Sequence, residues 1–352
     1  MKLRGVSKFS PLCFFIVNSI NNLKNMKLLY NYLIVILFVS VYSSSFSQTT
    51  KNDSIKLKPI IHVFNQAYYD INKESHNNDL GRTHLGLEYT FNSNLKAKII
   101  LDRKLNKFDS TISQNANQTQ DYYLMYLKFA SIQWQATSKF KIHLGAVLQN
   151  HYITQEKFWG LRYIAKTFQD QYFKIPSTDI GFIAYYKLSK YLSVDASVTD
   201  GRGTYLVNEE NNRKYSLGVD IRSKYWQTRF YYHNKNSANR EELFSAFGGF
   251  IPSKKFRLGS EFNYLRNALG VESDIYGYSV YSVYTYQNLD FFVRYDKIFT
   301  KKNKLMNKDT IICGFSYTLI QKVKLSLSYN LSTNSNNIIG LGFEYKILNE
   351  KT

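Results

Sequence analysis

Apolar and polar residues alternate with a period of two along most of the chain after residue 48. In the segment 192–199, Leu192, Val194, Ala196 and Val198 alternate with serine, threonine or aspartate. Successive side chains of a β-strand point to opposite faces, so this pattern predicts strands with one apolar and one polar face. The same stretch contains no apolar run of about 18 residues, the length that a transmembrane helix requires.

About sixteen segments carry this alternation, and it is weakest around Ala246. The sequence therefore predicts an all-β chain with strands centred near Val63, Leu87, Ile99, Leu127, Leu144, Ala184, Val194, Val219, Phe230, Ala246, Phe262, Val280, Val293, Phe315, Leu327 and Phe343.

The connections between these segments alternate between short and long. The predicted short connections are 91–94, 136–139, 188–190, 223–225, 252–255, 286–289 and 320–322. The predicted long, polar connections are 70–82, 104–119, 149–177, 201–212, 234–242, 266–274 and 297–309, and 332–337 is shorter than these. Tight turns at one end and long loops at the other are typical of an antiparallel transmembrane β-barrel of the bacterial outer membrane.

The composition agrees with a barrel that has a lipid-facing exterior and a wet interior. The chain is 44% hydrophobic and contains 30 Tyr and 25 Phe, yet its mean hydropathy is −0.35. Aromatic residues gather near predicted strand ends, where they would form girdles at the membrane interfaces; ordinary cross-strand packing is the alternative. These candidates are Tyr68, Tyr69, Tyr122, Tyr123, Tyr225, Trp226, Tyr231, Tyr232, Tyr286 and Tyr295.

The first 47 residues have the features of an export signal. Lys27 precedes an apolar stretch from Leu28 to Val41, and small residues from Ser45 to Ser47 suit cleavage before Gln48. We expect Met26 to be the start, residues 1–25 to be an upstream extension, and 48–352 to form a single barrel domain. A transmembrane anchor is the alternative. Only Cys313 would remain after cleavage, so no internal disulfide is expected.

A barrel of sixteen strands is wide enough to hold an aqueous channel. The third long connection, 149–177, contains apolar residues at helical spacing between Phe158 and Phe168. We therefore predict a short amphipathic helix over 158–170 that folds into the barrel and presents Arg162 and Lys166, with Asp170, at a constriction. A helix lying over the mouth of the barrel is an equally good interpretation.

Alternation also assigns charged residues to the inner face of the wall. The predicted basic lining consists of Lys98, Lys128, Lys141, Arg222, Arg229, Arg257, Arg294 and Lys324. The predicted acidic lining consists of Glu88, Asp102, Asp179, Asp195, Asp220, Glu261, Asp296 and Glu344. Basic rings favour anions, and the net charge is +20. Mixed signs on facing strands would instead create a transverse field.

Several segments resemble outer-membrane porins of the phosphate-selective O/P type. The likeness is carried by Phe158–Tyr172, Ser177–Gly181, Ser193–Asp195 with Asp200–Gly203, and Ala246–Phe250 followed by Phe256–Phe262. The resemblance covers most of residues 48–352. It implies a porin fold and passive diffusion of small hydrophilic solutes, with anions such as phosphate as candidates.

Other classes of function fit the sequence less well. An outer-membrane phospholipase would need a paired nucleophile and base, and the inward histidines (His84, His143 and His233) show no such pairing. There is no metal-binding motif, no cofactor is expected, and nucleic acid is not expected as a partner. The expected partners are outer-membrane lipid, small solutes and, as in many porins, two further copies in a homotrimer. A non-conducting barrel that acts through its outer loops is the main alternative.

Overall fold

The computed structural model describes residues 57–106, 122–204, 213–237, 239–268, 273–300, 307–333 and 336–347. The predicted signal peptide and its cleavage site lie outside these residues, so the division at Gln48 stays a prediction. In the described part of the chain, no helix combines the length and apolarity needed to cross a membrane.

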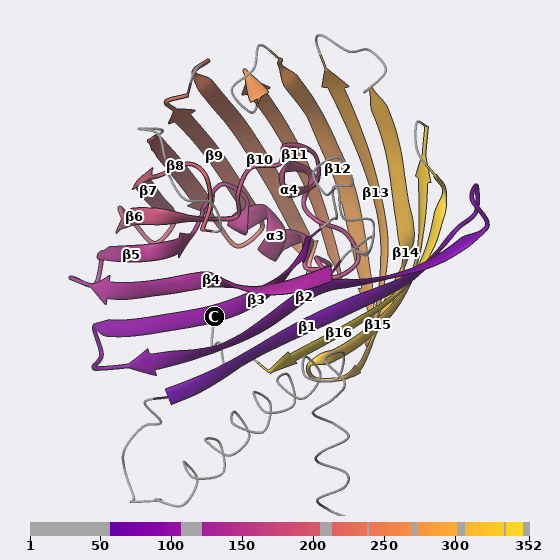
Figure 1. Cartoon of the computed structure of the whole chain (residues 1–352), viewed down its shortest axis with the longest axis horizontal. Helices are drawn as coiled ribbons and strands as arrows, with labels where there is room; N and C mark the ends of the chain where they lie inside the picture. Colours follow the sequence, from indigo (N-terminus) through magenta and orange to yellow (C-terminus); the bar gives the residue numbers. More distant parts are fainter. Residues whose placement is uncertain are drawn as a thin grey trace, which may run out of the picture. The chain divides into compact units, whose positions relative to one another are not determined.

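Sixteen antiparallel strands form one closed barrel (Figure 1). Each strand pairs with its neighbours in the sequence, and β1 closes the ring on β16. The strands are β1 (Leu57–Asp70), β2 (Ser75–Thr90), β3 (Leu95–Asn106), β4 (Tyr122–Gln135), β5 (Phe140–Leu148), β6 (Thr178–Lys187), β7 (Leu192–Thr199), β8 (Lys214–Arg222), β9 (Trp226–Lys235), β10 (Glu241–Ser253), β11 (Phe256–Arg266), β12 (Ile275–Tyr286), β13 (Leu289–Thr300), β14 (Lys308–Ile320), β15 (Val323–Ser332) and β16 (Ile338–Ile347).

The predicted fold class is confirmed, and every predicted strand centre lies inside a strand. This includes Ala246, which lies in the middle of β10 although its alternation is weak. Strand β10 pairs with β9 and β11 along most of its length. Pairing on both sides satisfies its backbone groups, and a membrane strand has no other way to satisfy them.

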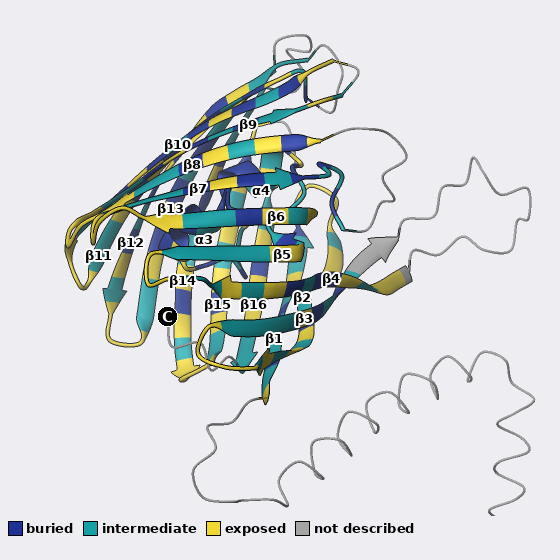
Figure 2. Ribbon diagram, turned by 90° about the vertical axis from the view of Figure 1, so that its left-hand side faces the viewer, coloured by how far each residue is buried: buried dark blue, intermediate teal, exposed yellow. Residues whose placement is uncertain are grey.

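The two faces of the barrel wall differ in polarity as the alternation predicts. In β12, for example, Tyr278 and Val280 are exposed on the outside, whereas Ser279 and Tyr281 are buried on the inside. Figure 2 shows the resulting bands of exposed and buried residues along the strands. Apolar residues exposed on one face of every strand are suited to lipid, because the hydrocarbon core cannot satisfy polar groups.

The predicted long connection at 70–82 is wrong. Strand β1 runs to Asp70 and β2 begins at Ser75, so only residues 71–74 connect them. Pairing continues as far as Asp70 opposite Ser75, with a register shift after Phe64. Residues 75–82 are mostly polar and therefore look like a loop in the sequence. In the structure this segment belongs to β2, and its backbone forms hydrogen bonds with the backbone of β1.

The predicted helix over 158–170 is also wrong. Two shorter helices overlap only the two ends of that segment: α3 (Ile153–Trp159) and α4 (Phe168–Tyr172). Gly160 takes the left-handed conformation (φ 70°) and its N–H binds the carbonyl of Glu156, which ends α3. Glycine is favoured in this C-terminal position because it has no Cβ to clash. Figure 1 shows α3 and α4 surrounded by strands.

Candidate functional site

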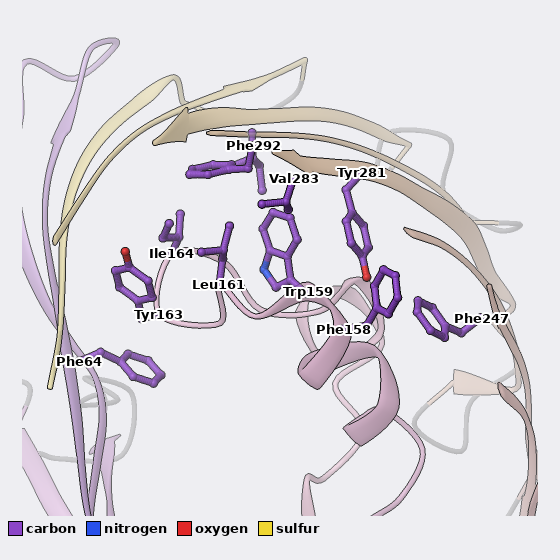
Figure 3. Close-up of a cluster of buried hydrophobic side chains, with 11 residues drawn as sticks. Phe64, Phe158, Trp159, Leu161, Tyr163, Ile164, Phe247, Tyr281, Val283 and Phe292 are labelled. Atoms are coloured by element: carbon purple, nitrogen blue, oxygen red, sulfur yellow. The ribbon is translucent and has the colours of Figure 1, made fainter. Parts of the chain in front are cut away.

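The segment between β5 and β6 is attached to the inner wall by a large apolar cluster. Phe158, Trp159, Leu161 and Ile164 pack with inward side chains of β1, β10, β12, β13 and β14 (Figure 3). The indole ring of Trp159 lies 4.8 Å from the ring of Tyr281 and 5.9 Å from that of Phe292. Inward apolar residues would be unfavourable in a wet interior, so this packing removes them from water.

A second apolar cluster attaches the C-terminal half of the same segment. Phe168, Phe173 and Ile175 are buried with inward residues of β9, β10, β11 and β13, among them Leu243 and Leu265. The side chain of Thr167 caps α4 by accepting a hydrogen bond from the N–H of Asp170. The segment is therefore attached to the wall at two places, first on β1, β10 and β12 to β14, and then on β9 to β11 and β13.

Side chains of the wall also bind the backbone of this segment. Arg257 Nη2 donates to the carbonyl of Trp159 at 3.1 Å, and Arg294 Nη1 donates to the carbonyl of Lys166. Gln66 donates to the carbonyls of Tyr163 and Ile164. Two of the residues predicted to line a pore, Arg257 and Arg294, therefore bind the loop with their guanidinium groups.

An ion-paired network, which we call the crossing network, connects the segment to the opposite wall. Arg162 Nε donates to Glu156 Oε2 at 3.2 Å, and its Nη2 donates to Asp170 Oδ2 at 2.8 Å. Arg82 of β2 reaches the other oxygen of Glu156 at 3.4 Å. Arg162, predicted to present a positive charge, is thus held between two carboxylates.

Strands β2, β3 and β4 add the rest of the crossing network. Asp102 accepts hydrogen bonds from Lys128 and from the N–H of Thr83, and it lies 3.1 Å from His84 Nε2. Arg82 and Arg162 lie close enough to Lys128 for their positive charges to repel its ammonium group. The network as a whole holds three basic residues (Arg82, Lys128 and Arg162) and three acidic ones (Asp102, Glu156 and Asp170).

Two tyrosines of the segment remain neutral beside these charges. Burial, together with the nearby carboxylates of Glu156 and Asp170, raises the pKa of Tyr152 well above its ordinary value. Burial raises the pKa of Tyr163 to about 12, and its hydroxyl donates to Ser316 Oγ at 2.7 Å. Both hydroxyl groups therefore keep their protons over the physiological pH range.

The remaining predicted residues are spread around the wall. Lys166 is exposed on the segment itself, and so is Lys157, which was not singled out from the sequence. Lys98, Lys141, Arg222 and Lys324 lie on the inner parity of their strands, and Lys324 faces Glu344 across the β15–β16 pair. Arg229 is buried and binds Asp195 with two hydrogen bonds, at 2.8 and 3.1 Å.

Arg82 and Glu156 were not identified as site residues from the sequence. Arg82 falls in the stretch predicted as a loop, and Glu156 precedes the predicted helix. Arg82 follows Gly81, the residue that the pairing of β1 with β2 skips, and this bulge shifts the period-two pattern by one residue. Within the described ranges, no group of three or more His, Cys, Asp or Glu side chains could hold a metal ion.

No protein-family model and no curated protein sequence matches the chain. Solved structures do match. OmpT of Vibrio cholerae aligns with a TM-score of 0.62 at 11% identity, over 85% of this chain and 100% of that one. OmpF of Salmonella typhi aligns with a TM-score of 0.62 at 12% identity, over 83% and 97%.

The outer membrane channel DcaP of Acinetobacter baumannii aligns with a TM-score of 0.57 at 13% identity, over 83% of this chain and 97% of that one. The three likenesses extend over nearly the whole length of each solved chain. At these low sequence identities, the likenesses establish the fold of the chain but do not identify a transported solute. The chain therefore shares the closed-barrel fold of outer-membrane channel proteins.

Proposed function

We propose that the protein is a porin of the bacterial outer membrane that lets small hydrophilic solutes diffuse passively. One observation carries the proposal: a closed barrel with an apolar exterior has a charged interior, and an ion-paired segment crosses that interior. The neighbours with the same fold support it, since one is described as an outer membrane channel. Residues 26–47 would direct export as a signal peptide.

We further propose a preference for anions, with phosphate among the candidate solutes. The crossing network is balanced in charge, so the preference must come from other residues. Lys141, Lys157 and Lys166 have no acidic partner among the described residues. Unpaired basic side chains along a water-filled passage raise the local concentration of anions. The resemblance to phosphate-selective porins agrees with this choice.

The test is conductance of the purified protein in a planar lipid bilayer, with the reversal potential measured across a potassium chloride gradient. We expect discrete open steps and a reversal potential that favours chloride. A reversal potential that favours potassium would agree with a porin but would refute the preference for anions. Folded protein that gives no steps would overturn the porin and favour a closed barrel that binds partners through its outer loops.

A further inference from the structure

A pocket lies between the start of α3 and the inner wall formed by β5 to β9. Its volume is about 470 Å³, and it is lined by Lys141, Asn150, Thr154, Tyr185, Asp220 and Arg222, among others. Residues of the short turns after β4 and β6 also line it. The pocket therefore lies toward the short-turn end of the barrel, away from the outer loops.

The acidic groups of this pocket are already occupied. Asp195 accepts two hydrogen bonds from Arg229, at 2.8 and 3.1 Å. Asp220 accepts a hydrogen bond from the Thr154 hydroxyl at 2.5 Å and lies 3.6 Å from Arg229 Nη1. A carboxylate with these partners has little remaining capacity for a cationic ligand.

Among the basic groups of the pocket, Arg229 is taken up by Asp195, whereas Lys141 and Arg222 can still approach a ligand. Lys141 Nζ lies 4.4 Å from the centre of the Tyr185 ring and has no acidic partner among the described residues. Arg222 is 3.7 Å from Asp220, and its side chain is 61% exposed. Lys139, Lys187 and Lys190 add positive charge to the same lining.

A neutral donor lies between α3 and the wall. The hydroxyl of Tyr185 donates to Asn150 Oδ1 at 2.9 Å, which fixes the orientation of the amide. This bond uses the amide oxygen of Asn150, so its amide nitrogen is the donor end of the same group. Arg222 can offer a carboxylate or phosphate its planar fork of donors, and Lys141 can add a second charge.

We propose that this pocket is a binding site for small solutes with a phosphate or carboxylate group, which enter from the short-turn end. The proposal rests on the proposed function in one respect, because a water-filled interior must admit the solute. Lys141 and Arg222 bind the anionic group, and Asn150 and Thr154 form the floor.

The test uses calorimetric titration of inorganic phosphate and, separately, succinate into the folded protein in an uncharged detergent. Arg222→Gln is the main variant, because this exposed side chain contributes little to packing. We expect it to weaken binding about tenfold, the usual effect of one lost charge-assisted hydrogen bond. Lys254→Gln is the control: it removes a charge from another short turn and should leave the affinity unchanged.

Lys141→Gln provides an independent second variant with the same expected direction. The proposed binding site would be refuted if all three variants bound the anions as tightly as the unsubstituted protein does. It would also be refuted if the unsubstituted protein bound neither anion. Stronger binding of phosphate than succinate, or the reverse, would identify the preferred group. Calorimetry needs no open channel, so protein that binds anions but gives no conductance would refute the porin and keep the pocket. Protein that conducts but binds neither anion would refute the binding site and keep the porin.

Discussion

Arg162 connects the two halves of the loop between β5 and β6. Its guanidinium group contacts Glu156 of α3 and Asp170 of α4, and it lies 5.8 Å from the centre of the Phe64 ring. Its charge thus both compensates two carboxylates and stabilises the turn between the helices. These two contributions can be separated by substitution.

We expect Arg162→Gln to shift the reversal potential toward cations, because the crossing network would then carry a net negative charge. A change of about 1 kcal/mol in the electrostatic energy of an ion corresponds to roughly a fivefold change in the permeability ratio. Arg162→Lys keeps the charge and should keep the selectivity. If both variants shift the potential equally, the geometry of the guanidinium matters more than its charge.

Residue-level roles could be predicted only in part from the sequence. Alternation places Arg257 and Arg294 on the inner face, but it cannot show that a loop covers them. Their partners are the carbonyls of Trp159 and Lys166, which lie far away in the sequence. Such contacts depend on the path of residues 149–177, and no local pattern encodes that path.

At the scale of elements, the short connections are predicted better than the long ones. The connections 91–94, 136–139 and 223–225 agree with the structure to the residue. The stretch 70–82 fails because polar strand and polar loop residues look alike once a strand extends past the lipid. The helix over 158–170 fails for a different reason, since apolar spacing outweighed the C-terminal signal of Gly160.

The attachment of the loop leads to a prediction at this scale. Trp159→Ala removes the largest buried side chain of the apolar cluster, at a cost of about 3–5 kcal/mol. We expect the loop to loosen, so that the single-channel conductance increases and becomes noisier. Bilayer recordings measure both effects.

Trp226→Ala is the matched control for this substitution. Trp226 is exposed on the outer surface, stacked on Phe250 with ring centres 4.3 Å apart. The same truncation there should leave the conductance unchanged. A conductance that is unchanged in Trp159→Ala as well would contradict the role of the apolar cluster in holding the loop.

The whole molecule is a closed ring, and this closure explains how a chain without a continuous apolar core remains folded. Every strand pairs on both sides, so the backbone hydrogen bonds are satisfied around the barrel. Apolar side chains cover the outside, and the loop packing supplies apolar clusters inside. The alternation predicts this architecture correctly because the sequence of each strand shows which of its residues face the lipid and which face the interior.

We expect the purified protein to be a homotrimer. Its outer surface exposes large apolar side chains, and these can pack against copies of the same barrel as well as against lipid. Native mass spectrometry from a mild detergent should give three times the mass of one chain. A monomer under conditions that preserve the folded barrel would refute this expectation.

The bonds from Gln66, Arg257 and Arg294 to the loop have a consequence for how such a protein can change over time. These wall residues bind main-chain carbonyls, which every amino acid provides. Substitutions at exposed loop positions such as Lys157 and Lys166 therefore leave these attachments intact. Mutations at these positions can change which solutes pass without releasing the loop from the wall. Related barrels can therefore differ in permeability while the loop keeps the same attachment.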